Sequence, residues 1–459
     1  MFFKIATGIS TFSPIVAEDV RSSTLQNDTD SWNREGFKEI PSPPEKYPYF
    51  GNMPSLQVEK WHKEHGPIIH LNMGTAHWVF INNPQIAHEV LVKKGAVTSE
   101  RHNHKFAYNM YSKNGSGIVF NRTGKKWKNS RNIGGLEQSI DSSLETLKEE
   151  SQKNEPVCLL PYLELITYGV IIKAVFGKDV ASIDDPLLKK FIYISRGVME
   201  HSGPKGNIAS VLPGFSWISR LTSVEKDMHA VVNIRDVSVK ELLNDAVSGE
   251  TDCLHATDLI VGAGDTTASL LLWLFAILAE YQDVQKIICA EIDTFMMKHG
   301  RIPSFSDRLD LPYTEAALLE SARFRCVSNF GVPHCVTEDG NMYAMHMNPD
   351  VYENPHKFMP ERFFGRTNSW NTSSNGSIKD RDIYMFGWGR RICPGIHLTE
   401  IEVFTVCIRF LARCSIEPPI GKDGKPETID LHELLGGGIT FTPKEYKVMF
   451  IPRNDSLPI

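Results

Sequence analysis

The segment from Leu254 to Tyr281 places the tightest limit on what this chain can form. Its second half, Leu270 to Ala279, is wholly apolar, which suits either a membrane span or a helix buried in a large core. That run is too short for the ~20 apolar residues that a span requires. Asp265, in the same segment, would cost about 2.5–3.5 kcal/mol at the centre of a bilayer. We therefore expect the core helix of a large domain.

Helical patterning dominates the rest of the chain, so we predict a mainly α fold with a small β region. Two strands joined by a turn at Gly74 come first, a helix from Pro84 to Lys94 follows, and strand-like segments lie around 437–451. The Gly-, Pro- and Asn-rich region 330–385 is predicted to be irregular, and within it 368–379 is predicted to form a polar surface loop. Further helices are expected around 122–131, 136–153, 159–176, 186–200, 224–245, 283–299, 312–325 and 396–413.

Composition narrows the class of protein. The chain has 459 residues, of which 41% are hydrophobic, so wholesale disorder is excluded. Its net charge of −6 lacks the basic excess of a nucleic-acid binder, and we expect no nucleic-acid partner. Residues 1–40 are expected to form a flexible segment, and 41–459 a single domain that begins at a proline-rich stretch. None of the eight cysteines forms a CxxC pair, which argues against a zinc ribbon or a disulfide scaffold.

The strongest chemical signal is a cysteine in a glycine-punctuated loop, Phe386-Gly-Trp-Gly-Arg-Arg-Ile-Cys-Pro-Gly395, placed directly before an apolar-periodic helix. Backbone N–H groups at a helix start stabilise an anion, so Cys393 is placed to be a thiolate. The glycines permit tight turns and the close approach of a flat ligand. An isolated cysteine would more often be a buried structural residue.

This segment resembles the haem-binding loop FxxGxRxCxG of the cytochrome P450 superfamily, of the eukaryotic microsomal type. The resemblance implies the P450 fold and a haem b cofactor, with Cys393 as the thiolate ligand of the iron. It also implies that Arg391 contacts a haem propionate and that Phe386 packs beside the ring, while Gly389 and Gly395 complete the loop.

Three further motifs occur in the order of the same family. Gly262 to Thr267 resembles the helix I pattern, with Ala263 in place of a glycine, and implies that Asp265 and Thr266 relay protons to dioxygen. Trp127 and Arg131 resemble the WxxxR of helix C, and they and His334 would contact haem propionates.

The third motif, Glu320 to Arg323, resembles the ExxR of helix K, with Arg362 in a PERF-like segment as its partner. On its own a Glu–Arg pair at this spacing is usually a solvated surface pair. In this setting the three residues would form a structural triad that holds the cysteine loop.

The implied activity is a haem-thiolate monooxygenase that inserts one atom of O₂ into a lipophilic substrate, with electrons from an NADPH-dependent flavin reductase. Two alternatives stay open: an enzyme that rearranges peroxides without a reductase, and a truncated, non-catalytic relic.

A basic cluster, Lys125, Lys126 and Lys128, is either a reductase-docking patch or a plain solvated helix face. Pocket walls are expected from 102–116, from helix I near Val261, from Val327–Val332 and from Gly438–Phe441.

The resemblance implies the cytosolic face of the endoplasmic reticulum membrane. Met1 to Val16 is too short and too interrupted for a spanning helix, so we expect weak membrane association through residues such as Phe2 and Phe3. Three regions are shorter than in the family: the stretch after Arg131, the stretch before helix I, and residues 340–345, which are too few to build an expected β-hairpin.

Overall fold

The computed structural model describes the folded body of the chain with gaps. The described residues are 41, 58–73, 76–95, 98–99, 101, 104–113, 118–120, 155–202, 224–243, 250–329, 331–332, 338–340, 342–435 and 439–453. The helices expected at 122–131 and 136–153, the boundary at residue 40, and the residues Trp127, Arg131 and His334 lie outside them.

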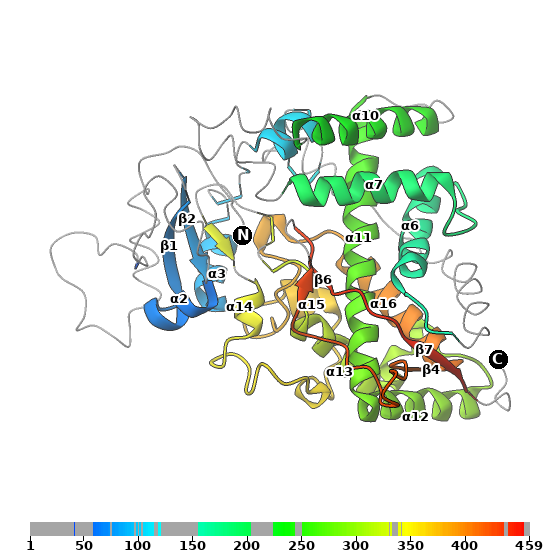
Figure 1. The fold of residues 1–459 in the computed structure, drawn as a ribbon. Helices are drawn as coiled ribbons and strands as arrows, with labels where there is room; N and C mark the ends of the chain where they lie inside the picture. Colours follow the sequence, from blue (N-terminus) through cyan, green and yellow to red (C-terminus); the bar gives the residue numbers. More distant parts are fainter. Residues whose placement is uncertain are drawn as a thin grey trace, which may run out of the picture.

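A long helix, α11, runs through the middle of the molecule and organises the other helices (Figure 1). Its stretch from Leu270 to Ala279 is buried under its neighbours. Within the described residues, Leu254–Glu280 is the one helical stretch long and apolar enough to cross a membrane, and most of it is buried inside the protein, as expected of a core helix. The long helices are α6 Leu160–Phe176, α7 Pro186–His201, α10 Val224–Leu243, α11 Glu250–Glu280, α12 Gln282–His299, α13 Pro312–Phe324 and α16 Ile396–Leu411.

Two apolar cores meet along α11. The larger core joins α11 to α12, α13 and α16, and the smaller one joins it to α6, α7 and α10. Figure 1 shows α7 and α10 crossing one end of α11 and α12 lying at the other end. Leu398, early in α16, packs against both cores. The segment that follows Cys393 is therefore anchored where the two cores meet.

The β structure is small, as the sequence predicted. Strands β1 Ile68–Met73 and β2 Ala76–Ile81 pair antiparallel, and β3 Glu338–Gly340 adds to β2 in parallel. Two further pairs are β4 Cys414–Glu417 with β7 Met449–Pro452 and β5 Leu434–Leu435 with β6 Thr442–Pro443. Among the residues described between α13 and residue 346, β3 is the one strand, and the short helix α14 Met342–His346 follows it.

The helix predicted from Pro84 to Lys94 is present, with π-helical geometry over its second half. It begins as α3 Pro84–Ala87 and continues as a π-helix, η2 His88–Lys93. In an α-helix the N–H of Lys94 would bond the carbonyl of Val90. Here the Thr98 hydroxyl donates to that carbonyl (3.0 Å), and the Lys94 N–H bonds Glu89 O (3.1 Å) instead. The hydrogen bond from the Thr98 side chain, eight residues further along the chain, thus accompanies the widened turn.

The prediction of a polar surface loop at 368–379 is wrong. Residues Trp370–Asn375 form helix α15, whose first turn is capped by the Ser369 side chain. The Trp370 side chain is buried in the larger core, and the backbone N–H of Trp370 donates to the carboxyl group of Glu400 in α16 (3.2 Å). One large apolar residue and one N-cap outweigh the polar composition of this segment. The remaining short elements are α2 Val58–His65, η3 Lys105–Tyr111, η6 Phe305–Asp310, η7 Pro360–Arg362 and η8 Gly389–Arg391.

Candidate active site

The cysteine loop folds back on itself and presents Cys393 directly before α16. The N–H of Cys393 donates to the carbonyl of Phe386 (2.9 Å), which closes the loop. The N–H of Gly395 donates to the sulfur of Cys393 (3.3 Å). Gly387 and Gly389 have φ of 79° and 58°, values that L side chains rarely adopt. The loop therefore supplies a sulfur that receives a backbone N–H, an arrangement that favours a thiolate.

Gly389 is required by close packing as well as by its backbone angle. A Cβ at this position would lie 2.1 Å from the carbonyl oxygen of Leu91 in η2. The neighbouring Arg391 is buried, and its Nε donates to the carbonyl of Ser99 (2.8 Å). Leu91 and Ser99 thus contact the loop at two nearby positions, Gly389 and Arg391.

Cys393 differs from most other described cysteines in its accessibility. Cys289, Cys326, Cys407 and Cys414 are buried, whereas Cys393 and Cys158 are partly exposed. Burial raises the pKa of Cys289 to about 11 and that of Cys326 to about 12, and burial also raises the pKa of Cys158. Among the described cysteines, only Cys393 combines access with a glycine loop and the start of a long helix.

The middle of α11 carries the second group of predicted site residues. The Thr266 hydroxyl donates to the carbonyl of Gly262, and the carboxyl of Asp265 accepts from the Thr440 hydroxyl (2.7 Å). Burial raises the pKa of Asp265, while the Thr440 hydrogen bond and the charge of Arg196 oppose that rise. Gly262 is exposed although it lies midway along the central helix, and a Cβ there would meet no atom within 4 Å. This face of α11 therefore borders open space.

Gly264, on the other side of the same turn, has a packing role. A Cβ there would lie 2.5 Å from the ring of Tyr168 in α6. The Thr167 hydroxyl also donates to the Gly264 carbonyl (2.9 Å). The two glycines thus have different roles: Gly264 lets α6 pack closely against α11, and Gly262 leaves open space beside the helix.

Segments expected to form pocket walls meet in one apolar cluster. Val261 is buried in this cluster, and Ala263, Val332 and Ile439 are partly buried against it; Val119 and Leu398, which lie outside the expected walls, join them. These residues come from five separate parts of the chain. They bring apolar surface to the part of α11 that contains Gly262.

Glu320, Arg323 and Arg362 lie together in the interior. Arg323 is completely buried. Its Nε and Nη2 donate hydrogen bonds to the two carboxyl oxygens of Glu320, at 2.6 and 2.7 Å. The Nε of Arg362 lies 3.4 Å from Glu320 Oε2, and the N–H of Met359 donates to Oε1 (3.0 Å). The usual interpretation of such a pair as solvated does not apply here.

His346 links this charged cluster to the cysteine loop, a role that sequence reasoning missed. Its carbonyl accepts from Arg323 Nη1 (2.8 Å), and its ring Nε2 accepts from the N–H of Tyr384 (2.9 Å). The backbone carbonyl of Tyr384 in turn accepts from the N–H of Gly387 (3.0 Å), and the Tyr384 ring stacks on the Trp388 ring. Burial lowers the pKa of His346 well below its usual value, so the ring stays neutral and can accept that bond. The only local signal was a histidine in an otherwise apolar stretch.

The comparisons with known proteins agree with this geometry. The family model described as Cytochrome P450 matches residues 41–248 and 250–450. The chain is 26% identical to Cytochrome P450 monooxygenase 58 of Postia placenta, with 91% of this chain and 90% of that protein covered. It is 24% identical to Tryptamine 4-monooxygenase of Psilocybe cyanescens, with 91% and 93% covered.

Solved structures support the same fold. A zebra fish cytochrome P450 structure with progesterone superimposes with a TM-score of 0.70 at 22% identity, covering 87% of this chain and 99% of that one. A second zebra fish structure, with abiraterone, gives a TM-score of 0.69 at 24% identity, covering 87% and 100%. The mainly α architecture predicted from the sequence is thereby confirmed as the P450 fold. The chain belongs to the cytochrome P450 family of monooxygenases.

Proposed function

We propose that this protein is a haem-thiolate monooxygenase that oxidises a lipophilic organic substrate with O₂ and electrons from an NADPH-dependent flavin reductase. The observation that carries the proposal is the cysteine loop, whose sulfur is accessible, receives a backbone N–H and precedes α16. Haem, when bound, supplies O₂ binding and activation at its iron.

The residues present fit a haem b group. A cysteine thiolate would hold the iron of such a haem, and Cys393 offers one with partial access. Open space at Gly262 and Gly387, where an added Cβ would meet no atom within 4 Å, suits a flat ring between α11 and the loop. We assign Cys393 as the iron ligand and Arg391, Trp127, Arg131 and His334 as propionate contacts. Phe386, Gly389 and Gly395 shape the loop around the ring.

The protein's own contribution to the chemistry is proton supply and exclusion of water. A buried carboxyl with a raised pKa holds its proton over a wider pH range than an exposed one, which fits Asp265 as a proton store. The Thr266 hydroxyl, one residue away on the same helix, would pass a proton at Oγ1 toward the oxygen site. The apolar cluster around Ala263 and Ile439 would hold a lipophilic substrate and keep bulk water out.

The carbon monoxide difference spectrum of the reduced protein tests this proposal. The parent should show the thiolate-type Soret band. Cys393→His should abolish that band, because imidazole replaces the thiolate. Cys158→Ser is the matched control, since Cys158 is the other partly exposed cysteine among those described, and it should keep the band. A thiolate spectrum in Cys393→His, or no haem in the parent, would overturn the assignment.

Location and electron donor are proposed on the family resemblance. We place the protein weakly on the cytosolic face of the endoplasmic reticulum membrane, and we propose Lys125, Lys126 and Lys128 as a reductase contact. These residues and Met1 to Val16 lie outside the described part of the chain. Carbonate extraction of membranes should release the protein, and retention in the pellet would contradict weak association. Changing the three lysines to Glu should slow the first electron transfer, and an unchanged rate would leave them as a solvated face.

A further inference from the structure

The C-terminal segment from Ile439 to Thr442 docks against α11 at the position of Asp265. The Thr440 hydroxyl donates to Asp265 Oδ2 (2.7 Å). One residue on, the Phe441 carbonyl accepts from Trp273 Nε1 (3.1 Å), and the Phe441 N–H donates to Val327 O (2.8 Å). The segment is therefore tied both to α11 and to the stretch that follows α13.

The same segment reaches the apolar cluster. Ile439 packs there, in the cluster that also contains Ala263 of α11. Adjacent residues of one loop thus provide an apolar contact beside the expected pocket and the hydroxyl that holds the carboxyl of Asp265.

We propose that Thr440 is a positioning residue: its hydroxyl fixes the carboxyl of Asp265 and couples that carboxyl to the loop that lines the substrate pocket. The proposal deepens the monooxygenase function and rests on it. Nothing in the helix I motif points to Thr440, which lies 175 positions later in the chain.

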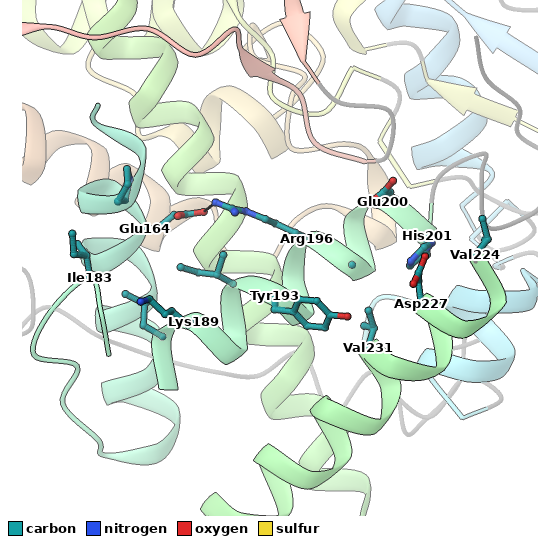
Figure 2. A pocket seen from close by; sticks show the side chains of 14 residues that line it. Glu164, Ile183, Lys189, Tyr193, Arg196, Glu200, His201, Val224, Asp227 and Val231 are labelled. Carbon is teal, nitrogen blue, oxygen red and sulfur yellow. Dashed lines mark hydrogen bonds and ion pairs between the residues drawn. The ribbon is translucent and has the colours of Figure 1, made fainter. Parts of the chain in front are cut away.

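The other groups that face Asp265 come from α6 and α7. Glu164 and Arg196 form an ion pair (2.6 Å), and Tyr168 lies against the helix at Gly264. Glu164 and Arg196 line a pocket of about 860 Å³ between α6, α7 and α10. Figure 2 shows the two side chains pointing toward one another. Burial raises the pKa values of Asp265, Glu164 and Tyr168; the charge of Arg196 opposes the rise at Asp265, and the charge of Asp265 adds to the rise at Glu164 and Tyr168. Thr440 therefore acts on Asp265 together with one cationic neighbour.

The ionisation of Asp265 in the purified, haem-loaded ferric protein tests the proposal without reductase or substrate. Infrared spectra report the carbonyl stretch of its protonated carboxyl, assigned by its loss in Asp265→Asn. Thr440→Val removes the donor to the carboxylate, so the titration midpoint should rise by about one pH unit. Thr440→Ser should restore the parent midpoint. Thr442→Val, two residues along the same segment, is the matched control and should leave it unchanged.

The loaded enzyme supplies the second measurement. Thr440→Val should release several-fold more hydrogen peroxide per NADPH than the parent, and Thr440→Ser should not. An unmoved midpoint in Thr440→Val, a midpoint equally moved in Thr442→Val, or an unchanged peroxide yield would each overturn the role of Thr440. Failure of the proposed function would look different: the parent would lack the thiolate spectrum or turn over no substrate, whatever the midpoint.

Discussion

Replacing Arg323 with Ala should destabilise the protein far more than the loss of one ion pair at the surface. Its guanidinium is completely buried, donates to both oxygens of Glu320, and also donates to the carbonyls of His346 (2.8 Å) and Pro355 (2.9 Å). The substitution leaves a buried carboxylate and several carbonyl groups without their strongest donor. The expected loss is about 3–5 kcal/mol, which is a large part of the roughly 5–15 kcal/mol that holds a typical domain folded.

The assay is urea unfolding followed by circular dichroism, with haem occupancy read from the absorbance spectrum. A double-mutant cycle with Glu320→Gln should be strongly non-additive, because the two residues share one network. Arg301→Ala is the matched control: Arg301 makes an equally short two-bond contact with Asp307 (2.7 and 2.8 Å), but at an exposed site. It should unfold close to the parent.

The result that would refute this reasoning is an Arg323→Ala protein that unfolds like Arg301→Ala and binds haem fully. The cluster would then be dispensable for holding the cysteine loop. A loss of haem without a loss of stability would also contradict it, since the argument places the effect in a buried network and carries it to the loop through His346 and Tyr384.

The remaining predictions concern proton supply, a buried acid and the loop. Thr266→Ala should keep the carbon monoxide spectrum and divert NADPH to peroxide; unchanged coupling of NADPH to product would remove its role. Burial raises the pKa of Glu402 to about 8, so its contribution to stability is full below pH ~4.5 and is lost as pH rises through 8. Glu402→Gln should therefore stabilise at pH 9 by up to about 5 kcal/mol and hardly change unfolding at pH 4.5; equal effects at both would contradict the burial argument. Gly389→Ala should abolish haem binding because its Cβ would strike Leu91 O, whereas Gly424→Ala, also at positive φ but in open space, should keep it.

Periodicity located the long helices from α6 to α16 and the first strand pair, because those patterns record which face of each element is buried. It failed at 368–379, where the burial of one large side chain outweighs a polar composition. There the buried indole of Trp370 belongs to a helix formed by a polar stretch.

The site divides in the same way. The motifs at Cys393, Asp265 and Glu320 are local and could be read from the chain. Thr440 and His346 could not, because each acts through a hydrogen bond to a residue far away in sequence. Their side chains carry no local pattern that separates them from ordinary threonines and histidines.

The contact of the cysteine loop with residues 91–99 has a consequence for how the molecule is made. Gly389 meets Leu91, and Arg391 bonds Ser99, 292 positions earlier in the chain. Contacts of such long sequence separation form late, because the intervening chain must first be brought together. During synthesis the loop emerges near the end, when the early segment has long been exposed. The cysteine loop therefore reaches its closed form only after Leu91 and Ser99 have met Gly389 and Arg391, and a fragment that lacks either group cannot make these contacts.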